Sequence, residues 1–255
     1  MRVEAMEWRR GLALAGLMLA CWVGGGTLLG GEPEGPPVVW LPFDDDMHDA
    51  GPLRLRGEVH GDGVSLQAGR RGRALFIGGT EDWLDLPLGA ALSLPRGVTL
   101  AMWLRRDDWT NPYRGGSGWQ TVASIGTSVT LSITAPGCPL HKPWALQGSV
   151  SRSRRDVGEE DSTHVLSQPG RVPPHAWLHA ALVHDPASRT LTLYLDGVQV
   201  DQARGVPPPD PPKWQIRLGT WHKANQAFRG LIDEVACYDY PRSAEAIARA
   251  AAARP

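Results

Sequence analysis

Two stretches of the sequence combine aromatic rings with side chains that form hydrogen bonds. Both fall where we expect loops, and a tryptophan or tyrosine face in a loop can stack on a sugar ring while polar neighbours bond its hydroxyl groups. The candidate ligand-binding residues are Trp109, Asn111, Tyr113, Arg114 and Trp119 in the first stretch and Trp221, His222 and Asn225 in the second. Ordinary packing of these loops against the domain is the alternative interpretation.

Tryptophan is frequent in this chain, which has 11 Trp against 3 Phe and 4 Tyr. An excess of tryptophan suits the core of a β-sandwich as well as a sugar-stacking face. Four of these residues fall within expected strands, where we predict that they belong to the core: Trp40, Trp83, Trp103 and Trp177. The residues that bind a sugar are therefore expected in loops and not inside strands.

The elements that would position these loops are organised around residues 177–197, WLHAALVHDPASRTLTLYLDG. Residues 178–184 form an apolar, β-favouring run, Asp185-Pro186 supplies a turn, and leucines alternate with threonine and tyrosine over residues 191–195. A second turn follows at Asp196-Gly197, where glycine can adopt the positive φ of a tight hairpin. The pattern predicts a buried antiparallel hairpin with the other strands beside it.

Four motifs in a fixed order resemble those of the laminin G-like, concanavalin A-like jelly-roll family. They are W-x-H-x-A at 177–181, L-Y-x-D-G at 193–197, L-G at 218–219 and F-x-G-x-I-D-E-V at 228–235. The resemblance covers residues 38–251 and implies an all-β fold, a sandwich of two antiparallel sheets with six or seven strands each. Residues 243–251 read as a short C-terminal helix capped by Ser243.

The resemblance also implies a structural calcium ion where the first and last strands meet. Asp44 and Asp233 match the acidic residues of such sites in many relatives, and a backbone carbonyl near Gly79 could add a further oxygen. Calcium takes roughly six to eight oxygen ligands. In the alternative interpretation Asp44 belongs to a solvated turn and Asp233 bonds to backbone amides.

The carboxylates do not predict an enzyme. Some jelly-roll glycosidases carry their acid and nucleophile on an E-x-D-x-x-E strand, and no such run occurs in this sequence. The acidic run Glu159 to Asp161 is typical of a solvated loop tip. We therefore predict a non-catalytic domain, with a glycoside hydrolase or lyase as a less favoured alternative.

Residues 1–31 are expected to lie outside this domain as a signal peptide or membrane anchor. Three arginines within the first ten residues precede an uncharged run that extends to Gly31, and the run of glycines at 24–26 favours export over anchoring. Cys21, which follows Ala20, resembles the lipidated cysteine of bacterial lipoproteins. Residues 32–37 then read as a linker, and residues 38–255 as the jelly-roll domain.

The number of cysteines is relevant to whether a disulfide could form in an oxidising compartment. If Cys21 is removed with a signal peptide or carries lipid, Cys138 and Cys237 remain as a pair that could form a disulfide in an oxidising environment. Two buried free thiols are the alternative.

The net charge of −1, without a long basic block, disfavours a nucleic-acid partner. We predict a recognition module located outside the cytoplasm, secreted, periplasmic or anchored at the cell envelope. It would contact the membrane only through its N-terminal segment and bind a glycan or a cell-surface protein. The competing function is a structural envelope protein that makes protein contacts only.

Overall fold

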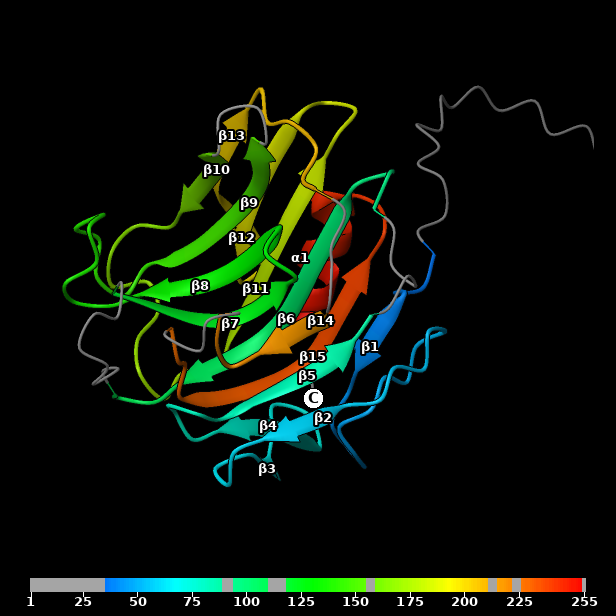
Figure 1. The fold of residues 1–255 in the computed structure, drawn as a ribbon, viewed down its shortest axis with the longest axis vertical. Coiled ribbons are helices and arrows are strands. Elements are labelled where there is room, and N and C mark those ends of the chain that lie inside the picture. The colour runs from blue at the N-terminus through cyan, green and yellow to red at the C-terminus, as the bar shows by residue number, and fades with distance from the viewer. Residues whose placement is uncertain are drawn as a thin grey trace, which may run out of the picture. The chain divides into compact units, whose positions relative to one another are not determined.

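The computed structural model describes residues 35–88, 94–109, 118–154, 159–210, 215–221 and 226–253. Residues 35–255 form one compact unit. Its described residues form two antiparallel sheets, of eight and seven strands, and one C-terminal helix (Figure 1). The predicted all-β sandwich is confirmed, with one strand more in the larger sheet than expected.

The eight-stranded sheet contains most of the motifs that carried the family resemblance. In spatial order its strands are β13 (Val198–Arg204), β12 (Thr190–Leu195), β11 (Leu178–Asp185), β6 (Val98–Arg106), β15 (Gly230–Tyr238), β4 (Arg73–Ile77) and β3 (Ser65–Ala68), and β1 (Val39–Leu41) also pairs with β15. The first half of β15 pairs with β4 and the second half pairs with β1, so these two strands lie along the same side of β15.

The seven-stranded sheet packs against the first sheet. In spatial order its strands are β10 (Glu159–Leu166), β9 (Leu146–Arg154), β8 (Val129–Thr134), β7 (Trp119–Ile125), β14 (Gln215–Leu218), β5 (Trp83–Pro87) and β2 (Glu58–His60). Inward-facing aliphatic side chains of both sheets form one core, as Leu100 and Met102 of β6 and Leu131 and Ile133 of β8 show by their complete burial. Each such side chain contributes about 1.5–3 kcal/mol by leaving water.

The hairpin at residues 178–204 forms as predicted. Leu182 of β11 pairs with Leu193 of β12, and the turn before β13 uses positive φ angles of 50° at Asp196 and 79° at Gly197. β11 and β12 lie in the interior of the sheet, and β13 forms its edge.

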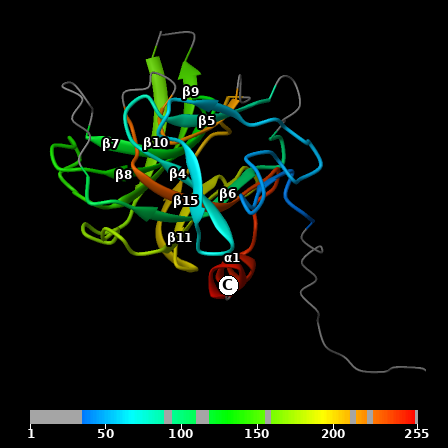
Figure 2. The same cartoon turned by 90° about the horizontal axis from the view of Figure 1, so that it is seen from below.

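The helix α1 (Ala244–Ala252) covers part of the outer face of the eight-stranded sheet. Its predicted cap is present, since the Ser243 side chain accepts a hydrogen bond from the Ala246 backbone N at 3.2 Å. Ile247 packs with Ala181, Val183 and other outward-facing side chains. Figure 2 shows α1 next to β11, on the side away from the seven-stranded sheet.

Of the four tryptophans predicted to belong to the core, Trp103 is buried, Trp83 and Trp177 are partly buried and Trp40 is exposed, and none joins the main cluster between the sheets. Val39 and Leu41 occupy the inward positions of β1, which turns Trp40 outward and leaves it 40% exposed. Likewise Met102 and Leu104 face the core from β6, and Trp103 covers the outer face beneath the Arg70 guanidinium. The period-two alternation of a strand places a large ring outside as readily as inside.

Within the described part of the chain, no helix is both long enough and apolar enough to span a bilayer.

Candidate functional site

The outer face of the seven-stranded sheet contains a hollow of 130 Å³, here called the polar hollow. Two tryptophans line it, together with hydroxyl, amide and imidazole side chains that come mainly from β8, β9 and β10. These residues are Trp119, Trp221, Thr127, Thr130, Ser132, Gln147, Ser149, Ser151, Ser162, His164 and Gln226.

The alternation of small polar and aliphatic residues produces this surface. On β8, Val129, Leu131 and Ile133 are fully buried in the core, which turns Thr130 and Ser132 to the outer face. Both outward side chains are themselves at least nine-tenths covered by protein. The floor of the hollow on β8 therefore has little contact with bulk water, whereas His164 at its edge is exposed.

A chain of hydrogen bonds crosses the polar hollow from β7 to β10. The indole N–H of Trp119 donates to Oε1 of Gln147, and this fixes the orientation of the amide because an indole nitrogen can only donate. The amide Nε2 of Gln147 then donates to Nδ1 of His164 at 2.8 Å. His164 consequently carries its proton on Nε2, which remains a hydrogen-bond donor.

His164 is in its neutral form near neutral pH. Burial of the ring by the surrounding protein lowers its pKa, although the residue as a whole keeps exposed surface at the edge of the sheet. The hydrogen bond from Gln147 acts in the same direction, because a protonated ring cannot accept at Nδ1. The hollow therefore presents uncharged donors and acceptors.

Two contacts hold the opposite side of the hollow. Thr121 of β7 donates its backbone N–H to the Gln226 carbonyl O at 2.8 Å and its hydroxyl to Gln226 Oε1 at 2.7 Å. Arg217 of β14 forms a bidentate ion pair with Asp85 of β5 at 2.7 Å for both contacts, and its Nη1 donates to the Trp221 carbonyl O at 3.4 Å. Strand residues thus position both Gln226 and Trp221.

The structure brings together two of the predicted ligand-binding residues, Trp119 and Trp221, one from each stretch. Trp109 packs elsewhere, against Gly79, where a Cβ atom would lie 3.2 Å from the indole ring. The other predicted residues lie outside the described part of the chain: Asn111, Tyr113, Arg114, His222 and Asn225.

Sequence reasoning missed the polar side chains of the hollow, among them Gln147, Ser149 and His164. A signal existed in the sequence, because VTLSIT at 129–134 and LQGSVS at 146–151 alternate aliphatic with small polar residues. That pattern predicts strands with one polar face, but it does not indicate that two tryptophans border this face.

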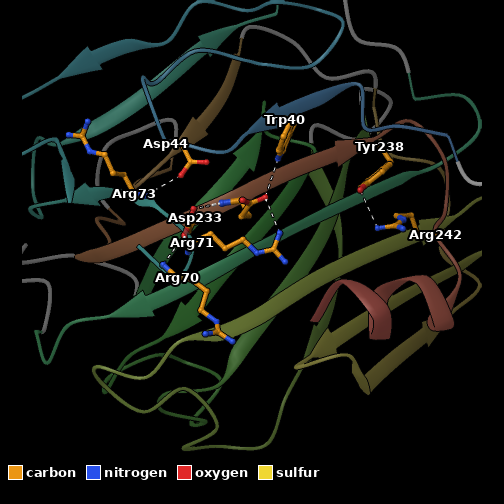
Figure 3. Close-up of polar contacts among 9 residues, drawn as sticks. Trp40, Asp44, Arg70, Arg71, Arg73, Asp233, Tyr238 and Arg242 are labelled. Carbon is orange, nitrogen blue, oxygen red and sulfur yellow. Dashed lines mark hydrogen bonds and ion pairs between the residues drawn. The ribbon is translucent and has the colours of Figure 1, made fainter. Parts of the chain in front are cut away.

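Asp44 and Asp233 both hold the turn between β3 and β4 (Figure 3). Asp233 Oδ2 accepts from the backbone N of Arg70 at 2.8 Å and of Arg71 at 2.9 Å, and its Oδ1 accepts from the N of Glu234 at 2.8 Å. Asp44 Oδ1 accepts from the backbone N of Arg73 at 3.2 Å. Burial raises the pKa of Asp233 to about 6, and the three N–H groups only partly oppose that shift.

This donor set does not fit a calcium ion. Gly79 follows the opposite end of β4 from the turn that Asp44 and Asp233 hold, about 16 Å of strand away. Among the described residues no three His, Cys, Asp or Glu side chains are grouped to hold a metal. The calcium prediction itself remains untested, and the contacts match its alternative, in which Asp233 bonds to backbone amides.

Cys138 and Cys237 are both buried free thiols, so the disulfide predicted between them is absent. Cys237 faces the core from β15, opposite Val39 of β1. Cys138 follows β8 of the other sheet and lies against Gly118. Burial raises the pKa of Cys237 to about 12 and also raises that of Cys138, so both remain protonated thiols at neutral pH. The predicted lipidation site, Cys21, lies outside the described residues.

The comparisons with known proteins agree with this architecture. A family model for the concanavalin A-like lectin/glucanases superfamily matches residues 78–248. No curated protein sequence matches the chain.

Similar solved structures include three from toxins. They are the binding domain of Paraclostridial mosquitocidal protein 1 (TM-score 0.66, 12% identity, 85% of this chain and 52% of that one), the receptor binding domain of botulinum neurotoxin type G (TM-score 0.62, 9%, 85% and 51%), and a structure of botulinum neurotoxin type C, a toxin whose cell entry depends on interaction with two ganglioside molecules (TM-score 0.61, 11%, 85% and 50%). The chain spans about half the length of each, and at this identity the likeness shows the fold alone.

Proposed function

Because the chain belongs to the concanavalin A-like lectin/glucanase superfamily, we propose that it is a non-catalytic recognition module that binds a glycan in the polar hollow. The observation that carries this proposal is the meeting of Trp119 and Trp221 over one floor of hydroxyl and amide groups. These two residues are far apart in the sequence, and each belongs to a stretch with the composition of a sugar-binding loop.

The chemistry of the lining residues suits a sugar. Each sugar hydroxyl both donates and accepts, as do the hydroxyls of Ser149 and Ser151, while the apolar face of a pyranose ring can stack on an indole. His164 adds an N–H donor at Nε2 because its Nδ1 is held by Gln147. The volume of 130 Å³ lies below the range of about 300–1,000 Å³ of small-molecule sites, so the hollow would contact one terminal sugar residue at most and not enclose an extended chain.

The same lining residues favour binding over hydrolysis. Glycoside hydrolysis uses a pair of carboxylates on either side of the scissile bond. The described residues that line the polar hollow include neither aspartate nor glutamate. The Asp85 carboxylate is paired with Arg217, which in turn donates to the Trp221 carbonyl O.

The fold neighbours support a glycan as the ligand class. One is the botulinum neurotoxin type C structure whose description names ganglioside molecules, which carry glycan head groups. A location outside the cytoplasm, expected from residues 1–31, belongs to the same proposal, since glycans of envelopes and cell surfaces would be the accessible ligands. Fractionation of cells that express the full chain, followed by immunoblotting, tests this location.

Glycan binding is tested on an array of neutral, N-acetylated and sialylated glycans, followed by calorimetric titration of the best hit. We expect Trp119→Ala and Trp221→Ala each to weaken the affinity roughly tenfold, which is the scale of one lost ring contact. Trp177→Ala is the matched control, because Trp177 stacks with Arg105 of the other sheet. Binding to no glycan, or equal losses in all three folded variants, would contradict the proposal.

A further inference from the structure

The outer face of the eight-stranded sheet contains a second and larger cavity, a groove of 440 Å³ beside α1. Two small side chains form its floor, Ala101 of β6 and Ala236 of β15, which pair with each other. Three rings stand around this floor: Trp40, Trp103 and Tyr238. We call this cavity the aromatic groove.

A β-bulge in β15 directs an additional carboxylate into the aromatic groove. Ile232 and Val235 both belong to the core cluster. The two residues between them, Asp233 and Glu234, lie on the outer side of the sheet, where Glu234 lines the groove. The register of β15 shifts at this point, and Glu234 has a positive φ of 50°, which is unfavourable for a residue other than glycine. Because Asp233 holds the turn between β3 and β4, Glu234 is the carboxylate that faces the groove.

The Glu234 carboxylate uses one of its two oxygens. Its Oε2 accepts from the Trp40 indole N–H at 3.2 Å and lies 3.9 Å from Arg71 Nη1, and Figure 3 shows both side chains directed toward it. Its Oε1 accepts no hydrogen bond from any described residue, and it is not enclosed, since the side chain is 16% exposed. The groove therefore offers an accessible acceptor oxygen to a ligand that can donate.

Other polar groups around the groove are engaged by the protein itself. The Arg242 guanidinium lies over the Tyr238 ring, 4.6 Å from its centroid, and donates to the Tyr238 hydroxyl at 3.2 Å. The Arg70 guanidinium covers Trp103 in the same way at 4.7 Å. The Nδ1 atom of His179 is enclosed by protein, beyond the reach of a ligand. Glu234 Oε1 is therefore the group that we expect to recognise a ligand.

We propose that the aromatic groove binds a small uncharged ligand that carries a hydroxyl group on an apolar body. The body would lie over the two alanines and stack on the Trp40 ring, which is 40% exposed. The hydroxyl would donate to Glu234 Oε1. An anionic group would be repelled by Glu234 and a cationic group by Arg71. The volume lies within the range of about 300–1,000 Å³ of small-molecule sites.

This site is independent of the proposed glycan site. The aromatic groove lies on β1, β6, β11 and β15, whereas the polar hollow lies on strands of the opposite sheet. Each site can therefore be blocked without the other.

The test uses the full chain and four aromatic alcohols: 2-naphthol, indole-3-ethanol, 2-phenylethanol and 3-phenylpropan-1-ol. Saturation-transfer NMR detects binding, and calorimetry compares the best alcohol with its methyl ether, which keeps the apolar body but cannot donate. We expect at least one alcohol to bind, and its ether to bind at least about tenfold more weakly, the scale of a hydrogen bond to a charged acceptor. No binding by any alcohol at millimolar concentration, or equal affinity of the alcohol and the ether, would overturn the proposal.

Glu234→Gln tests the acceptor itself. An indole N–H can only donate, so the glutamine oxygen should stay with Trp40 and the amide NH₂ should face the ligand. The alcohol should then lose its advantage, with the affinities of alcohol and ether within about threefold of each other. A purely structural role of Glu234 would weaken both ligands by the same factor. An alcohol that keeps its tenfold advantage in this variant would therefore contradict recognition by Glu234.

Three leucine substitutions locate the site. Ala236→Leu fills the groove from its floor without entering the core, and Ala250→Leu fills it from α1. Each should abolish binding of the alcohol. Ser132→Leu places the same side chain in the polar hollow and should leave that binding unchanged. Binding that survives both groove substitutions in the folded protein would show that the alcohol binds elsewhere and would overturn the proposal.

Discussion

The two sheets of this sandwich present opposite chemistry on their outer faces, although strand alternation builds both. The polar hollow is lined by hydroxyl, amide and imidazole groups, and the aromatic groove by rings, methyl groups and two arginines. In the polar hollow, Gln147 is bonded on both sides, to Trp119 and to His164. In the aromatic groove, His179 has an unpartnered Nδ1.

The two surfaces therefore differ in whether their buried polar groups have hydrogen-bond partners within the protein. A hydrogen-bonded network holds its side chains in place before a ligand arrives, so binding costs little ordering. A buried nitrogen without a partner instead raises the free energy of the folded chain. The polar hollow is thus preorganised, whereas the aromatic groove lies over a buried nitrogen that has no hydrogen-bond partner among the described residues.

The largest predicted effect concerns the turn that carries Arg71 into the aromatic groove. Asp233→Ala leaves the backbone N–H groups of Arg70, Arg71 and Glu234 without their acceptor. We expect the free energy of unfolding to fall by about 3 kcal/mol, at roughly 1 kcal/mol for each lost bond. Urea denaturation followed by tryptophan fluorescence measures it.

The control is Asp44→Ala, an exposed carboxylate after β1 that accepts from the backbone N of Arg73, which should cost less than about 1 kcal/mol. Equal losses in both variants would show that Asp233 does not anchor the turn. Unfolding of the unmodified chain in calcium and then in excess chelator tests the calcium prediction, and a higher midpoint in calcium would support it.

The next prediction distinguishes His179 from His164 by the pH dependence of the free energy of unfolding. The pKa of His179 is about 4 in the folded chain against 6.5 for an unperturbed ring, so the unfolded state binds the proton more strongly. The contribution of His179 to stability is therefore complete above pH 6.5 and is lost as the pH decreases toward 4, by roughly 3 kcal/mol. Asp233, whose pKa is raised to about 6, has the opposite effect over the same range, so the His179 contribution is read from the difference between the variant and the unmodified chain. His179→Leu should remove most of this acid-dependent loss, measured by urea denaturation across that range. If His164→Gln removes it instead, the comparison between the two faces is wrong.

Ligand selectivity gives a smaller effect that tests the comparison directly. Trp221→Ala should weaken the glycan roughly tenfold and leave the affinity for the aromatic alcohol unchanged, because Trp221 lines only the polar hollow. Calorimetry with each ligand on the same sample provides the measurement. Equal losses of affinity for both ligands in this variant would indicate a general structural change rather than two separate sites.

The smallest predicted effect is the pH dependence of glycan binding. Burial lowers the pKa of His164, so its ring is neutral at neutral pH and gains a proton only in acid. A protonated His164 can no longer accept from Gln147, which disturbs the chain to Trp119. We expect glycan affinity to fall a few-fold toward acid pH and to lose this dependence in His164→Gln. An unchanged acid limb in that variant would exclude His164 as its origin.

Local patterns in the sequence predicted the fold well because they act over a few residues. The Asp196-Gly197 turn requires positive φ, and Ser243 supplies the cap that begins α1. Both are determined by short-range backbone chemistry. The pairing of β15 with both β4 and β1 depends on long-range contacts, which one sequence does not reveal.

The candidate sites were harder to predict because they depend on which residues, far apart in the sequence, become neighbours in the folded chain. Trp119 and Trp221 could be identified as binding residues from composition, but not as neighbours. Trp40 and Trp103 were assigned to the core, since an apolar ring in a strand carries no sign of which face it occupies. The floor of the aromatic groove consists of alanines, whose role appears only once the strands are aligned.

The helix α1 adds a dynamic consequence to the difference between the two faces. It forms one wall of the aromatic groove through Ala250 and Ala253, yet its buried residues are only Ala246 and Ile247. An element with so few buried contacts unfolds locally at a lower free energy than a strand such as β6, so its amide hydrogens should exchange sooner. We therefore expect local unfolding of α1 to widen the groove, because Ala250 of the helix lines it. The range of ligand sizes that the groove accepts would then depend on the equilibrium between the folded and the locally unfolded helix.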